Sequence, residues 1–169
     1  MKHHVFALVI SATALGISIP AMASNTILCP DIAKAKQVAE CPAEEELDRM
    51  FTVSCGFERD PEAKKPELCD SYAEFKRRKH TALWESSDGE FMGYVTCATP
   101  SAEIKMAKPS SVAVSQKNGL HKISCNYQGA IKFTMRTRDT CKVLAVNNAN
   151  IAMQGDCSSD ASNCKVECD

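Results

Sequence analysis

The stretch that decides the fold is residues 121–136, which read HKISCNYQGAIKFTMR. Apolar and polar side chains alternate on both sides of the Gln128-Gly129 pair. Such an alternation places successive side chains on opposite faces of a β-strand, and glycine in a short connection supplies the backbone freedom of a turn. The sequence therefore predicts a β-hairpin. Its apolar face carries His121, Ile123, Cys125, Tyr127, Ile131, Phe133 and Met135, and its polar face carries Lys122, Ser124, Asn126, Lys132, Thr134 and Arg136.

The same alternation continues through the second half of the chain, about residues 81–155. Residues 82–85 and 91–97 flank the segment SSDGE, which is typical of a hairpin turn. Shorter alternating stretches predict further strands at 104–106, 112–114 and 141–146. We therefore expect an antiparallel sheet of about five strands.

The first half, about residues 30–80, predicts helices instead. Residues 31–40 place apolar side chains on one helical face and end before a proline. A second helix is expected to follow, because Leu47 and Phe51 recur at the spacing of one helical face.

A third helix is expected to begin at Ser71 and to end in the basic run at 76–79. Ser71 and Glu74 have the spacing of a capping box, and cations stabilise a helix C-terminus. We therefore interpret the basic run as a helix end rather than as a nucleic-acid or lipid site. Residues 55–69, rich in proline and charge, predict a surface loop. Together these elements predict an α+β fold in which short N-terminal helices pack on the antiparallel sheet.

Residues 1–23 have the parts of a secretory signal peptide: a short basic start, an apolar run and an Ala-x-Ala end. Cleavage after Ala23 predicts a mature chain of residues 24–169 with no remaining membrane span. We expect it to form a single disulfide-rich α+β domain. Its parts would be the helical part 30–80, the strand-rich part 81–155 and a cysteine-rich tail, 156–169, of irregular structure. The style of the leader is bacterial, so we expect a periplasmic protein, with release from the cell as the alternative.

The chain has 10 cysteines, none of them in the leader. An even number of cysteines in an exported protein predicts a disulfide framework. No Cys-x-x-Cys pair indicates a redox-exchange site. We expect every cysteine to be cross-linked, while spacing alone leaves the pairing open. The candidates are Cys29, Cys41, Cys55, Cys69, Cys97, Cys125, Cys141, Cys157, Cys164 and Cys168.

Charge divides the chain in the same way as the predicted structure. Residues 31–90 contain 15 acidic and 10 basic residues, whereas residues 91–155 contain 2 acidic and 8 basic residues. One interpretation is that acidic helices lie against a basic sheet within one fold. The other is that the polar face of the sheet meets an anionic partner.

The sequence predicts no catalytic, cofactor-binding or metal-ligating residue. We interpret His80 as a cation at a helix end and His121 as a half-buried strand residue. The tail does place oxygen-bearing side chains at the spacing of a calcium loop. However, Ala161 occupies the sharp-turn position, where such loops have glycine, and two cysteines lie inside the loop, so we expect no calcium binding. The side chains concerned are Asp156, Ser158, Asp160, Ser162 and Glu167.

Three short motifs give the chain a resemblance to a known family. Residues 27–32 read ILCPDI, Trp84 and the segment FMGY at 91–94 follow in mid-chain, and residues 123–127 read ISCNY. This pattern resembles the EirA proteins, small exported proteins of intracellular bacteria associated with the Dot/Icm type IV secretion system. The resemblance implies a periplasmic accessory needed for secretion and intracellular growth, without known catalysis. It assigns no site residue.

From these observations we expect a non-enzymatic exported interaction protein with one or more protein partners, among them components of a secretion machine. The alternative is a secreted disulfide-rich effector or inhibitor that acts on a host or envelope enzyme. We expect no nucleic-acid partner, and the sequence leaves the oligomeric state open. A cleft that gathers His121, a carboxylate and an unpaired cysteine would indicate an enzyme instead.

Overall fold

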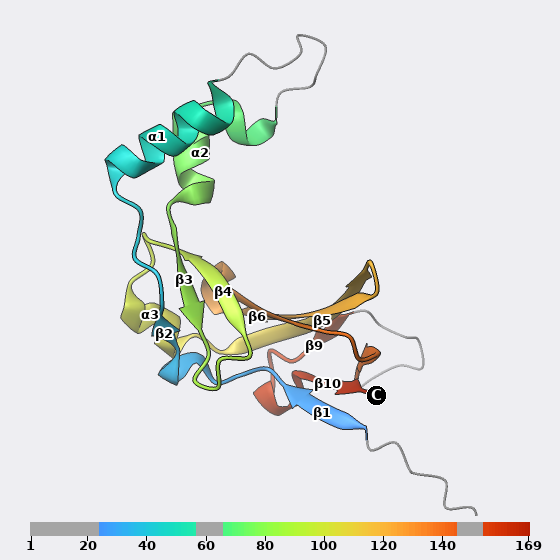
Figure 1. Cartoon of the computed structure of the whole chain (residues 1–169). Coiled ribbons are helices and arrows are strands. Elements are labelled where there is room, and N and C mark those ends of the chain that lie inside the picture. Colours follow the sequence, from blue (N-terminus) through green and yellow to red (C-terminus); the bar gives the residue numbers. More distant parts are fainter. Residues whose placement is uncertain (1–23, 57–65, 145–153) are drawn as a thin grey trace, which may run out of the picture.

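The structure, a computed structural model, describes residues 24–56, 66–144 and 154–169. The predicted signal peptide and residues 57–65 and 145–153 lie outside this part. The predicted fold class is confirmed: the described chain combines three α-helices with two antiparallel sheets and is joined by disulfide bonds (Figure 1).

The larger sheet has seven strands in the order β2-β3-β4-β7-β6-β5-β9, all antiparallel. Both predicted hairpins belong to it, as β3–β4 and β6–β7. The sheet has more strands than the expected five because the short edge strands β2 and β9 lack a readable alternation. The strands are β2 (Lys36–Gln37), β3 (Thr81–Glu85), β4 (Met92–Thr96), β7 (Lys132–Thr137), β6 (Leu120–Tyr127), β5 (Pro109–Lys117) and β9 (Gln154–Asp156).

The β6–β7 hairpin has the predicted faces. Ile123 pairs with Met135 and Cys125 pairs with Phe133 on the apolar face. The predicted turn is also present: Gly129 has a φ of 72°, in the left-handed region that glycine tolerates best. Alternation therefore predicted the buried face of this hairpin, and the Gln128-Gly129 pair predicted its turn.

The smaller sheet has three strands in the order β1-β10-β8. The prediction of an irregular tail was wrong, because β10 is its central strand. Val166 and Cys168 are buried, whereas Lys165 and Glu167 alternate with them on the other face. The strands are β1 (Asn25–Leu28), β10 (Lys165–Cys168) and β8 (Cys141–Val143).

The prediction of a helix at residues 31–40 was also wrong. The structure has a short 3-10 turn, η1 (Ile32–Lys34), followed by the edge strand β2. Lys36 and Gln37 pair with the two last residues of β3. Sheet pairing here overrides a weak helical periodicity, since isolated helices of this length are marginal.

The prediction of a strand at residues 104–106 was wrong as well. The expected strand is instead part of α3 (Ser101–Met106), which begins directly after Pro100. Proline favours helix starts because its fixed φ suits the first turn, and here its φ is −61°. The alternation was too short to distinguish a strand from one turn of helix.

The other two predicted helices are present and form a hairpin, which we call the helical hairpin. It consists of α1 (Glu44–Cys55), the 3-10 turn η2 (Glu67–Cys69) and α2 (Tyr72–Lys79). The predicted cap is confirmed, because the Ser71 side chain accepts a hydrogen bond from the Glu74 backbone N–H. The Phe51 ring meets the rings of Tyr72 and Phe75 edge-on, at centroid distances of 5.5 and 5.4 Å. Figure 1 shows the helical hairpin at one end of the molecule, beyond β3 and β4.

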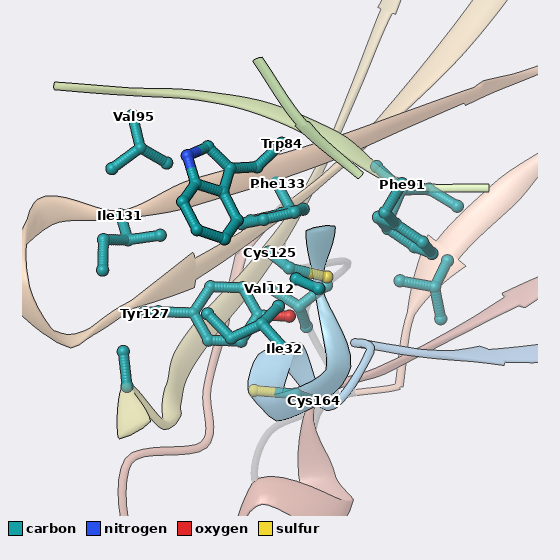
Figure 2. Close-up of a cluster of buried hydrophobic side chains, with 14 of the residues drawn as sticks. Ile32, Trp84, Phe91, Val95, Val112, Cys125, Tyr127, Ile131, Phe133 and Cys164 are labelled. Carbon is teal, nitrogen blue, oxygen red and sulfur yellow. The ribbon is translucent and has the colours of Figure 1, made fainter. Parts of the chain in front are cut away.

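The main core lies on one side of the seven-stranded sheet, where η1, α3 and the three-stranded sheet cover it. Trp84 and Phe133 enter it from the large sheet, and Ile32 enters from η1. Figure 2 shows these side chains together with Tyr127 and Cys164. The buried residues of the helical hairpin, among them Leu47 and Phe75, do not belong to this cluster.

All ten cysteines are paired in the structure. Cys29–Cys125 spans 96 residues of sequence, and Cys41–Cys97, which spans 56, ties the entry of α1 to the end of β4. Five disulfides indicate an oxidising, extracytoplasmic environment. The remaining pairs are Cys55–Cys69, Cys141–Cys168 and Cys157–Cys164.

Within the described residues, the structure contains no helix with the length and apolar character needed to span a membrane.

Candidate functional site

The candidate site is the face of the seven-stranded sheet that points away from the core, which we call the outer face. Its strands β3, β4 and β7 surround a hollow of about 450 Å³, called the outer-face hollow. The residues that line it are Leu83, Met92, Gly93, Tyr94, Lys132, Thr134 and Arg136.

Strand register brings these side chains together. Leu83 is directly opposite Tyr94, and Met92 is directly opposite Thr134. Because side chains alternate between the two faces of a strand, their chain neighbours Trp84 and Phe133 point into the core. The same alternation that builds the core therefore builds the outer face.

Large apolar side chains on this face are exposed. Tyr94 is 72% exposed and Met92 is 45% exposed. Tyr94 also lines a second hollow of about 590 Å³, which reaches Glu46 and Met50 of α1. An exposed aromatic side chain shared by two hollows is the kind of anchor that protein interfaces use.

Gly93 makes the close approach of β4 and β7 possible. A side-chain carbon at this position would lie 2.3 Å from the Lys132 carbonyl oxygen, so any other residue would push the strands apart. A side chain at this position would point to the core side, where Gly93 is opposite Trp84, so only the backbone of Gly93 lines the outer-face hollow.

The outer face is basic. Lys122 is directly opposite Arg136 across β6 and β7, and Lys132 lies further along β7. Lys117 and Leu120 line a third hollow, of about 460 Å³, which also includes Arg136. Neither this hollow nor the outer-face hollow has an aspartate or glutamate in its lining.

Ion pairing leaves these cations uncompensated. Among the described residues, four of the ion pairs lie within the helical part and the fifth joins Lys142 to Glu167 of the tail. None involves Lys122, Lys132 or Arg136. The interpretation that acidic helices lie against the basic sheet is therefore not supported by any ion pair in the part of the chain that the structure describes.

The basic run of α2 is engaged locally. Lys76 pairs with Glu44, and Arg77 and Arg78 both pair with Glu74. Hydrogen bonds from Arg77 and then Arg78 lower the pKa of the Glu74 carboxyl to about 2. These contacts support the interpretation of the run as a helix end.

The two histidines of the described residues belong to different parts of the fold. His80 follows the last residue of α2, and its backbone N–H donates to the Lys76 carbonyl. His121 is buried on the core side, where its Nδ1 accepts a hydrogen bond from the Cys141 backbone N–H at 3.3 Å. With every cysteine paired, no described residues form the combination of His121, carboxylate and free thiol that would indicate an enzyme.

The side chains of the tail that have the spacing of a calcium loop form hydrogen bonds within the protein. Asp156 accepts from Ser158, and Asp160 accepts from the Ser162 backbone N–H. Glu167 accepts from the Ser24 hydroxyl at 2.9 Å. Within the described ranges, no group of three or more histidine, cysteine or acidic residues has an arrangement that could hold a metal ion.

The motifs that carry the family resemblance have structural roles. The first and the last of them are joined by Cys29–Cys125 and by a hydrogen bond of 2.6 Å from the Tyr127 hydroxyl to the Pro30 carbonyl. Trp84 is buried in the core. Within these motifs, Met92 and Tyr94 on β4 and Ser124 and Asn126 on β6 belong to the outer face, whereas the buried and cross-linked residues stabilise the fold.

Sequence reasoning identified part of this site. Alternation placed Lys132, Thr134 and Arg136 on a polar face, and the charge distribution offered an anionic partner for it. It missed Leu83 and Tyr94, because their proximity to β7 depends on a strand order that the sequence does not state.

Comparison of the chain with family models, with curated proteins and with solved structures found no match in any of the three.

Proposed function

We propose that this protein is an exported, non-enzymatic binding module whose protein partner docks on the outer face. The observation that carries the proposal is the exposed Tyr94 beside a hollow with uncompensated cations. Aromatic residues supply much of the binding energy of protein interfaces, and charge supplies orientation and association rate.

The disulfide framework supports this function. Cys41–Cys97 fixes the end of β4 and Cys29–Cys125 fixes β6, so the two strands that flank β7 in the outer face are both held by covalent links. A surface that is rigid before binding loses less conformational entropy when the partner docks. No catalytic group is required for such a role.

More specifically, we propose that the protein is a periplasmic accessory of a type IV secretion system, as the resemblance to the EirA proteins implies. The alternative is a secreted effector or inhibitor that acts on a host or envelope enzyme. Both use the same docking surface, and the identity of the partner separates them.

Site-specific photo-crosslinking tests the docking surface. We expect p-benzoylphenylalanine in place of Tyr94 to crosslink a discrete envelope protein, whereas the same group in place of Met106 on α3, which is 69% exposed, should not. A secretion component in the Tyr94 adduct supports the accessory role, and a host or envelope enzyme supports the alternative. Equal crosslinking from both positions, or none from Tyr94, would contradict docking on the outer face.

A further inference from the structure

We propose that the occupant of the outer face is an extended polypeptide segment with the pattern acid-x-apolar-x-acid, where x is any residue. This inference rests on the proposed docking function and adds the chemistry of the partner to it.

The spacing of two cations sets the positions of the acids. Lys132 and Arg136 lie four residues apart on β7 and point to the outer face. Strands rise about 3.3 Å per residue, so these positions are about 13 Å apart along the strand. An extended ligand has the same rise, and its first and fifth side chains point to one side. Two carboxylates at these positions would therefore meet both cations.

The hollow between the cations sets the apolar position. Thr134 lies between Lys132 and Arg136 and faces Met92 across β4 and β7. Beside it, the backbone of Gly93 lines the hollow. The third side chain of the ligand points into this space, where an aliphatic group would contact apolar surface on Met92 and on the half-buried Leu83.

The surrounding charge selects an acidic ligand over a neutral one. Lys122 adds a third cation directly opposite Arg136. The same face of the sheet also has an acid, Glu85, which is directly opposite Met92 but does not line the hollow. A hollow lined by cations and by no acid attracts carboxylates and repels basic segments.

The shape of the site favours a polypeptide over a lipid surface. The apolar floor lies in a hollow bounded by Tyr94 and Arg136 rather than on a projecting tip. A flat bilayer would touch the cations without reaching the floor, whereas a single extended chain can fill it.

Fluorescein-labelled peptides with three different cores test the pattern by fluorescence anisotropy at low ionic strength. The cores are Glu-Ser-Leu-Ser-Glu, its amide counterpart Gln-Ser-Leu-Ser-Gln, and Glu-Ser-Ser-Ser-Glu without the apolar residue. We expect the first to bind about tenfold more tightly than the second, because two exposed charge pairs are lost. The third should also bind several-fold more weakly than the first.

Charge-reversal variants test whether the acidic peptide binds to the outer face. The double variant Lys132→Glu/Arg136→Glu should lose the preference for the acidic peptide. The matched control Lys34→Glu/Lys105→Glu makes the same change of charge at exposed positions elsewhere and should keep it. Circular dichroism of both variants checks that the fold is intact.

Three results would overturn the inference. They are equal binding of the acidic and amide peptides, no binding of Glu-Ser-Leu-Ser-Glu, and binding of the protein to phosphatidylglycerol vesicles in place of the peptides. Any of them, together with a specific crosslink from Tyr94, would reject the acidic pattern and leave the docking surface standing. A missing crosslink from Tyr94 would reject the docking surface itself.

Discussion

Adjacent residues of one strand have opposite roles in this protein. Phe133 is fully buried in the core, whereas its neighbours Lys132 and Thr134 line the outer-face hollow. At such positions the core and the proposed binding surface can be altered separately, because side chains on the two faces of a strand do not touch each other. Single substitutions can therefore distinguish stability from binding.

Tyr127 illustrates a residue that acts on stability. Its hydroxyl donates to the Pro30 carbonyl, and burial raises the pKa of this phenol above its ordinary value. We expect Tyr127→Phe to lower the free energy of unfolding by about 1–2 kcal/mol, because the carbonyl loses its partner. Urea denaturation measures this. Tyr94→Phe is the matched control and should change stability by less than about 0.5 kcal/mol; equal effects at the two sites would contradict the assignment.

The lowered pKa of Glu74 predicts that the stability of the helical hairpin depends on pH. The folded-state pKa of this carboxyl, about 2, lies below its ordinary value of 4.5. A lowered carboxyl pKa stabilises the fold above the ordinary pKa, and this contribution is lost as the pH falls toward the folded-state pKa. We expect the stability difference between the wild type and Glu74→Gln to be constant above about pH 4.5 and to shrink toward pH 2. Acid titration followed by circular dichroism measures it, and Glu45→Gln, whose carboxyl forms none of the ion pairs of the described chain, should show no such change.

At the level of elements, long alternating or capped segments were predictable and short ones were not. The β6–β7 hairpin and the start of α2 at Ser71 agree with the structure, because each is specified by several residues within one element. Residues 31–40 were assigned to the wrong class because β3, far along the chain, pairs with them, and residues 104–106 because their alternation was too short to distinguish a strand from a helix. The outer face was predictable only where it follows β7, since the neighbouring β4 joins it through strand order.

The helical hairpin behaves as a separate element held by its own disulfide. Cys55–Cys69 closes a segment of 14 residues, for which the chain-entropy model gives about 3 kcal/mol. We expect the double variant Cys55→Ser/Cys69→Ser to destabilise α1 and α2 while leaving the large sheet intact, because the hairpin's buried residues lie outside the main core. Hydrogen exchange should show faster exchange in α1 and α2 and unchanged protection in β6. A similar loss of protection in β6 would show that the two parts unfold as one.

At the level of the whole molecule, covalent links join segments that are distant in sequence. Cys29–Cys125 attaches the N-terminal strand segment to the central hairpin, and Cys141–Cys168 ties the tail to β8. These links hold the layers that cover the core, whereas the basic side chains of the outer face lie on the other side of the same sheet. Rigidity and an open basic surface are thus produced by different residues of the same strands.

Disulfide mapping of natively purified protein tests this arrangement most directly. Alkylation without reductant should label none of the cysteines, and reduction should expose all ten. Proteolysis under non-reducing conditions should yield peptides linked as Cys29–Cys125, Cys41–Cys97, Cys55–Cys69, Cys141–Cys168 and Cys157–Cys164. Labelling of thiols before reduction, or a different set of linked peptides, would contradict the stapled fold on which the docking surface depends.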